Sequence, residues 1–128
     1  MSPANDSTMP KPKLILIVED DHDICDIMTL YFENKGYKVA TISNSREAIT
    51  MIQKTIPDIL ITDLKMPLGS GVELLQNLKA QGIKIPKIAV MSGYADFSQN
   101  ELSALGAQAV VQKPCLPQDI LLKLEEKI

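Results

Sequence analysis

Two groups of acidic residues stand out because each follows a run of aliphatic residues. The first group, Glu19-Asp20-Asp21, comes directly after residues 14–18, and the second is Asp63, which ends a similar run. Three adjacent carboxylates repel one another, and hydrogen bonds, protonation or a bound cation are the usual remedies. An acidic cluster that offers only oxygen ligands suits a hard cation such as Mg²⁺. The sequence therefore predicts a cation site beside the first group.

Asp63, Ser92 and Lys113 together have the functional groups that phosphoryl transfer needs. An aspartate is ordinarily ionised at neutral pH, so Asp63 could act as a nucleophile without a general base. Mg²⁺ and the Lys113 ammonium would neutralise the oxygens of a phosphoryl group, and the Ser92 hydroxyl could hydrogen-bond one of them. The chemistry that these residue types favour is the formation of an aspartyl phosphate on Asp63.

Segments typical of strands and of helices alternate along the chain. Short apolar runs predict strands that are buried on both faces, and apolar residues at helical spacing follow each run. The expected strands are residues 14–18, 37–42, 58–63, 86–91 and 109–112, and the expected helices are about residues 21–35, 45–56, 71–81, 95–105 and 117–128. Five such alternations predict an α/β fold, a doubly wound three-layer α/β/α sandwich around a five-stranded parallel sheet.

The end and the inner face of the first helix can also be predicted. Ile24, Ile27, Met28 and Tyr31 have helical spacing, so they are expected to face the core. Gly36 follows them in the position of a carboxyl-terminal cap.

The parallel sheet gives the scattered polar residues a common location. The carboxyl ends of parallel strands lie at one edge of the sheet, which would bring together Glu19, Asp20, Asp63, Ser92 and Lys113. Each residue also has a simpler explanation, since Asp20 or Asp21 could cap the first helix and Ser92 or Lys113 could be an ordinary loop residue. One cap cannot use all three adjacent acids. The joint placement of these residues therefore favours a functional site.

The composition limits the function further. A chain of 128 residues with 45% hydrophobic residues fits one domain, and its net charge of −3 argues against a nucleic-acid binder. The chain has neither an apolar run long enough for a membrane span nor a signal-peptide pattern, so we expect a cytoplasmic protein. Residues 1–13, with three prolines, are expected to form a flexible tail before a domain at residues 14–128. Cys25 and Cys115 are expected to be free thiols.

Residues 14–128 closely resemble the receiver domain of two-component response regulators, which is CheY-like. The matching pieces are ILIVEDD, PDILITDLKMP with Gly71 beyond it, AVMSG, Gly106-Ala107 and Lys113-Pro114. Each piece is weak alone, but their order and spacing are highly specific. The resemblance implies a flavodoxin-like sheet with strand order 2-1-3-4-5.

The resemblance also implies a role for each residue of the predicted site. Glu19 and Asp20 would bind Mg²⁺, with Asp20 the direct ligand, and the main-chain carbonyl of Lys65 would complete the metal shell with Asp63. Asp63 would be the phosphoacceptor, Ser92 the switch hydroxyl and Lys113 the phosphoryl-binding lysine, followed by a cis bond to Pro114. The donor would be a sensor histidine kinase or a phosphotransfer protein.

The resemblance implies a signalling domain that controls a downstream partner or effector domain. It also implies that two copies of the domain could form a dimer when they are phosphorylated. Such a domain is not a conventional enzyme, but it promotes its own aspartate phosphorylation and dephosphorylation. The sequence departs from many receivers at Val110, where they have a Tyr or Phe ring that turns inward on activation, so this chain lacks the aromatic part of that switch.

Other functions are compatible with parts of the pattern. A receiver-like docking module without physiological phosphorylation would explain Val110, although the complete set of acids, hydroxyl and lysine argues against it. Phosphatases of the haloacid-dehalogenase type also use a strand-end aspartate, but they need an acid at the position of Lys65. A flavodoxin-like cofactor binder would need a phosphate-binding loop after the first strand, where this chain has acids.

Overall fold

A parallel sheet forms the centre of the molecule in the computed structural model, which describes residues 12–65, 70–93 and 99–125. Its strands are β1 (Leu14–Val18), β2 (Lys38–Ile42), β3 (Ile59–Asp63), β4 (Lys87–Ser92) and β5 (Ala109–Gln112). All pairs are parallel and the order is β2-β1-β3-β4-β5. The predicted strand order is therefore confirmed.

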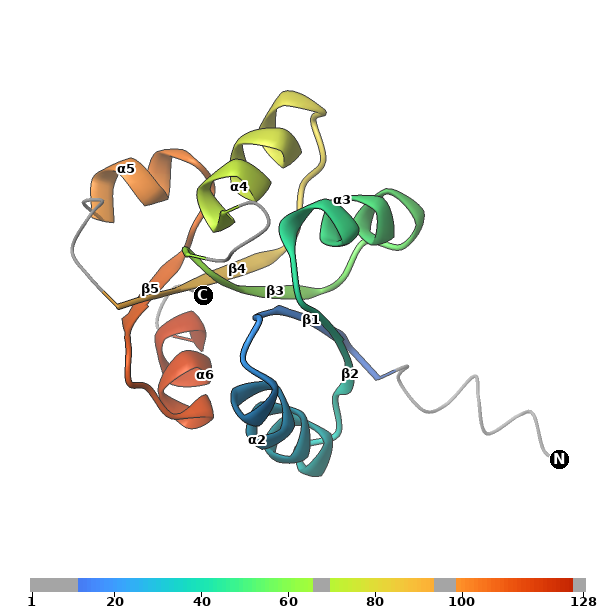
Figure 1. Cartoon of the computed structure of the whole chain (residues 1–128), viewed down its shortest axis with the longest axis vertical. Helices are drawn as coiled ribbons and strands as arrows, with labels where there is room; N and C mark the ends of the chain where they lie inside the picture. Colours follow the sequence, from blue (N-terminus) through green and yellow to red (C-terminus); the bar gives the residue numbers. More distant parts are fainter. Residues whose placement is uncertain (1–11, 66–69, 94–98, 126–128) are drawn as a thin grey trace, which may run out of the picture.

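Helices cover both faces of this sheet and make three layers (Figure 1). Helices α3 (Ser45–Lys54), α4 (Gly71–Ala80) and α5 (Gln99–Ala104) lie on one face, and α2 (His22–Asn34) and α6 (Pro117–Glu125) lie on the other. Each face has its own cluster of buried apolar side chains. The predicted α/β/α sandwich is confirmed.

The aliphatic run of β1 is continuous because this strand faces a helical layer on each side. Leu16 and Val18 belong to the cluster under α3 and α4, whereas Ile15 and Ile17 belong to the cluster under α2 and α6. These four side chains are fully buried. A central parallel strand has no solvent face, so successive residues on both sides are apolar.

Polar side chains cap the helices that lead away from the carboxyl edge of the sheet. The Asp21 carboxylate accepts hydrogen bonds from the main-chain nitrogens of Asp23, at 2.9 Å, and Ile24, at 3.2 Å, at the start of α2. The side chains of Asn44 and Ser70 begin α3 and α4 in the same way. Gly36 follows the end of α2 with φ of 94°, as expected for a carboxyl-terminal cap.

The predicted inner face of the first helix is wrong at Ile27, which is 60% exposed. The buried residues of α2 are Cys25, Met28 and Phe32. The stripe that contains them is rotated away from Ile27, and it includes Phe32, the largest fully buried side chain, which belongs to the apolar cluster beneath α2 and α6. Spacing alone could not choose between two overlapping apolar stripes.

Several smaller predictions can be compared with the described residues. Cys25 and Cys115 are free. Among the residues described, no helix is both long and apolar enough to cross a membrane. The helix expected at residues 95–105 is seen from Gln99 to Ala104, and its earlier part, with Phe97, lies outside the described ranges. The boundary of the predicted tail at Lys13 stays a prediction, and the Lys13 carbonyl accepts a hydrogen bond from Lys38 N at 2.9 Å.

Asp58 joins the amino ends of three strands, and its removal is expected to destabilise the fold. Its carboxylate accepts from Leu14 N at 2.8 Å, its main-chain nitrogen donates to Leu14 O at 2.9 Å, and its carbonyl accepts from Lys87 N. We predict that Asp58→Ala lowers the free energy of unfolding by about 1–2 kcal/mol, because Leu14 N loses its acceptor. Urea unfolding measures the change. Asp58→Asn retains an acceptor oxygen and should lose less, and equal losses would contradict the prediction.

Candidate functional site

The sheet brings the predicted site residues to one edge. Glu19 and Asp20 follow the end of β1, and Asp63 is the last residue of the neighbouring strand β3. Ser92 ends β4, on the other side of β3, in the register position after the partner of Asp63. Because all strands are parallel, residues far apart in the sequence meet beyond the carboxyl ends of the strands.

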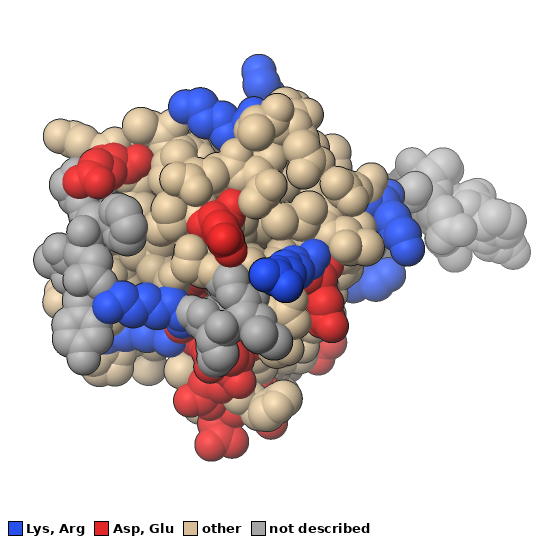
Figure 2. Space-filling view, turned by 45° about the horizontal axis from the view of Figure 1, so that its top comes forward, with Lys and Arg blue, Asp and Glu red and all other residues tan. Residues whose placement is uncertain are grey.

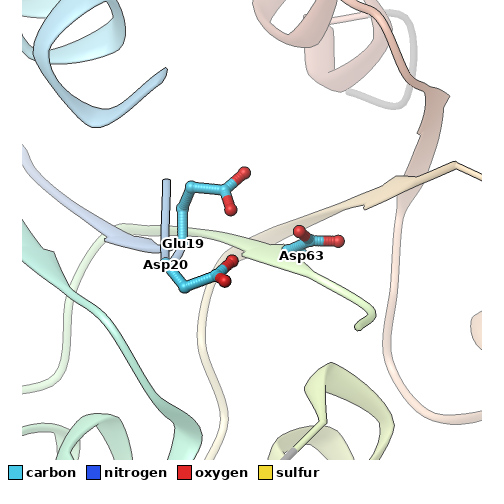
Figure 3. A group of neighbouring side chains, drawn as sticks. All are labelled: Glu19, Asp20 and Asp63. Atoms are coloured by element: carbon cyan, nitrogen blue, oxygen red, sulfur yellow. The ribbon is translucent and has the colours of Figure 1, made fainter. Parts of the chain in front are cut away.

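Three carboxylates form a cluster at this edge (Figure 3). Glu19, Asp20 and Asp63 each offer one carboxylate oxygen, and these oxygens lie within 4.8 Å of one another. Glu19 and Asp63 are buried, whereas Asp20 is exposed. A set of oxygen ligands with one solvent-facing member fits a hard divalent cation that keeps part of its water shell.

Lys113, which directly follows the edge strand β5, contacts both buried acids. Its Nζ lies 2.8 Å from Glu19 Oε1 and 2.7 Å from Asp63 Oδ2. Its main-chain nitrogen donates to the carbonyl of Ser92 at 2.8 Å, which holds the end of β5 against the end of β4. The bond between Lys113 and Pro114 is cis, as the family resemblance implied.

The electrostatics of the cluster show an excess of negative charge. Burial raises the pKa of Glu19, and the hydrogen bond from Lys113 opposes this rise without cancelling it. Burial also opposes the charge of Lys113, but its hydrogen bonds with Asp63 and Glu19 outweigh burial and raise its pKa. One ammonium thus faces three acids, and a further cation would complete the charge balance.

The third of the adjacent acids has a different task. The Asp21 carboxylate caps α2, while its main-chain nitrogen donates to Glu19 Oε2 at 3.3 Å. The prediction that one of the acids serves as a helix cap is therefore confirmed, and that acid is Asp21. Lys65 lies next to the cluster, since its main-chain nitrogen donates to Asp63 Oδ1 at 3.3 Å. The role of the Lys65 carbonyl stays a prediction.

Three residues around the site had no role assigned from the sequence. Thr62 Oγ1 donates to the carbonyl oxygen of Asp63 at 3.0 Å, and Gly71 packs closely against the same carbonyl. Cys25 Sγ donates to the carbonyl of Glu19 at 3.4 Å, and burial raises the pKa of this thiol to about 11. Thr62 left a signal in the sequence as a polar residue that interrupts a buried aliphatic strand, and Gly71 left one as a member of the family motif.

Residues 15–125 match the model of the response regulator receiver domain family, and the chain therefore belongs to this family. The response regulator SaeR of Staphylococcus aureus is 36% identical over 110 residues, which are 86% of this chain and 48% of SaeR. The chain thus spans about half the length of the curated relatives it matches. It is a receiver domain of the two-component type, as the sequence predicted.

Solved structures of similar proteins have the same architecture. A CheY-like response regulator receiver domain protein from Methanospirillum hungatei is 34% identical, with a TM-score of 0.78, over 91% of this chain and 93% of that chain. The chemotaxis response regulator CheY4 of Vibrio cholerae is 27% identical, with a TM-score of 0.80, over 91% of this chain and 99% of that chain. The fold class follows from both the sheet and these matches.

Removal of the Lys113 ammonium is expected to destabilise the protein in a pH-dependent way. Lys113→Met should lower the free energy of unfolding by about 1–3 kcal/mol near pH 7, because two buried acids lose their counter-ion. The variant also loses a contact that lowers the pKa of Glu19, so this pKa rises further. A raised carboxyl pKa means that the folded state binds protons more tightly than the unfolded state, so stability increases as the pH falls.

The loss should therefore be smaller near pH 5 than near pH 7. Urea unfolding of both proteins at the two pH values measures the difference. Lys113→Arg keeps the positive charge and serves as the control. A loss of the same size at both pH values would contradict the electrostatic explanation.

Proposed function

We propose that this chain accepts a phosphoryl group on Asp63, in a Mg²⁺-dependent reaction, from a phosphohistidine of a sensor histidine kinase or phosphotransfer protein. The observation that carries the proposal is the arrangement around the Asp63 carboxylate, which lies 2.7 Å from the Lys113 ammonium and within the cluster of Glu19 and Asp20. The receiver family membership supports the same reaction.

The transfer is a displacement at phosphorus. A carboxylate oxygen of Asp63 forms the new O–P bond, the P–N bond to the donor imidazole breaks, and its electron pair returns to the ring nitrogen. Asp63 needs no general base, because it reacts as the carboxylate. The chain supplies position and charge rather than covalent chemistry, which is what phosphoryl transfer requires of a protein.

The cation site follows from the acidic cluster. Asp20 and Asp63 would hold Mg²⁺ directly, with Glu19 close by and the main-chain carbonyl of Lys65 as a further ligand. Bound Mg²⁺ would neutralise negative charge on the phosphoryl oxygens. In the structure, the Lys113 ammonium donates a hydrogen bond to the unphosphorylated carboxylate of Asp63. After transfer, Lys113 would donate to one phosphoryl oxygen and the Ser92 hydroxyl would donate to another.

Phosphorylation would change the conformation and thereby control a partner or effector domain. Val110 has no aromatic ring to reorient, so Ser92 and the ends of β3 and β4 would transmit the change. Since the chain spans about half of its curated relatives, the effector can belong to the same protein or to another one. The net charge of the chain is −3, and on the face shown in Figure 2 the Lys and Arg side chains of the described residues are spread apart. Together these observations support a protein partner over direct nucleic-acid binding.

Labelling of Asp63 tests the proposal directly. Incubation with Mg²⁺ and acetyl phosphate should add one phosphoryl group, seen in the mass of the intact protein, and chelation of Mg²⁺ should abolish the addition. Asp63→Asn should remain unlabelled. A wild-type protein that takes up no phosphoryl group would support the alternative of a docking module that is not phosphorylated, whereas an Asp63→Asn variant labelled equally would refute Asp63 as the acceptor.

Neighbouring acids provide a matched pair for the metal site. We expect Asp20→Ala to weaken Mg²⁺ binding by about tenfold or more, because it removes a ligand of the cluster. Asp21→Ala should lower the free energy of unfolding by about 1 kcal/mol through loss of the α2 cap, with Mg²⁺ affinity largely unchanged. Isothermal titration with Mg²⁺ and urea unfolding separate the two effects. Equal weakening of Mg²⁺ binding in both variants would refute the assignment of Asp20.

A further inference from the structure

Thr62 has an unusual position for a hydroxyl side chain. It lies in the middle strand of the sheet, opposite Val18 of β1 and Val90 of β4, and it is fully buried. Burying a hydroxyl costs free energy unless it makes a hydrogen bond. Thr62 makes this bond to the carbonyl oxygen of Asp63, at 3.0 Å, and thus to the main chain of the proposed phosphoacceptor itself.

This carbonyl lies just past the last residue pair between β1 and β3. The last such pair joins Val18 to Thr62. The main-chain nitrogen of Leu64 donates toward β4, to Met91 O at 3.0 Å. In a trans peptide the carbonyl points opposite to the N–H, so the Asp63 carbonyl points toward β1, beyond the paired part of that strand. The Thr62 hydroxyl supplies a hydrogen bond where the paired part of the sheet has ended.

Gly71 restricts the same carbonyl from another direction. A Cβ atom at Gly71 would overlap the carbonyl oxygen of Asp63, so the first turn of α4 packs directly on it. The main-chain nitrogen of Gly71 also donates to the carbonyl of Leu64 at 3.0 Å. The peptide unit that follows Asp63 is therefore held by contacts from Thr62, Met91 and Gly71.

We infer that Thr62 is a positioning residue for phosphoryl transfer to Asp63, because its buried hydroxyl fixes the peptide unit that sets the direction of the carboxylate. The same peptide unit leads to Lys65, whose main-chain carbonyl is a proposed metal ligand. Thr62 thus aligns the acceptor and the cation site without contact to either the phosphoryl group or the metal. This inference rests on the proposed function.

Two substitutions separate the hydroxyl from the rest of the side chain. Thr62→Val keeps the shape and removes the hydroxyl, whereas Thr62→Ser keeps the hydroxyl and removes a buried methyl group. We expect Thr62→Val to slow phosphorylation by acetyl phosphate about tenfold at saturating Mg²⁺, since small displacements of a reacting group reduce rates strongly. Thr62→Ser should retain most of the wild-type rate even though the lost methyl group lowers its stability.

A spectroscopic measurement tests the contact independently of phosphorylation. The ¹³C resonance of the Asp63 carbonyl should shift in Thr62→Val, which loses a hydrogen-bond donor to that oxygen, and stay near the wild-type position in Thr62→Ser.

A Thr62→Val protein that is phosphorylated at the wild-type rate overturns the inference. The inference also fails if the phosphorylation rates of the two variants simply fall in proportion to their losses of unfolding free energy. If even the wild type is not labelled, the proposed function fails, whereas a labelled wild type with no effect of Thr62→Val refutes only the role of Thr62.

Discussion

The contact between the Lys113 ammonium and the buried acids is the interaction on which the site depends. Burying an unpaired ion costs several kcal/mol, so Glu19 and Asp63 need a positive charge close by. Lys113 supplies it from the other end of the chain, at 2.8 and 2.7 Å. This contact joins the ends of β1, β3 and β5, but it leaves the cluster acidic. The arrangement that stabilises the protein therefore still leaves negative charge at the carboxyl edge of the sheet, which favours the binding of a cation.

The topology explains why the cluster forms at β1 and β3. These strands are neighbours at the sheet centre, and the chain turns to β2 on one side and to β4 on the other. Ligands of open α/β sheets bind at such a switch point, because the connections diverge there. Both strands are buried between two helical layers, so the acids follow strands that are packed on both faces. Groups attached to such strands are placed more precisely than groups on loops.

The sequence predicted the strands, the layers and the charged cluster because these depend on simple patterns. An aliphatic run followed by an acid identifies both a buried strand and the end at which the acids gather, as after Val18 and Thr62. Ile27 shows the limit, since two apolar stripes overlap on one helix and only the stripe with Cys25, Met28 and Phe32 is buried. The contact of Gly71 with the Asp63 carbonyl joins two elements across a loop. The family motif includes Gly71, but the sequence around it does not show which main-chain atom approaches it.

Val110 restricts how a chemical change at Asp63 could reach the surface. Its side chain is half-buried and packs against the apolar cluster beneath α3 and α4. The valine side chain is small and has one restricted torsion. It therefore cannot turn between the solvent and the interior as an aromatic ring can. Under the proposed function, the signal would then pass through Ser92 and the main chain. The bonds from Leu64 N to Met91 O and from Lys113 N to Ser92 O already link the ends of β3, β4 and β5. A shift of the peptide after Asp63 would therefore be felt directly at β4, where Ser92 begins the next connection.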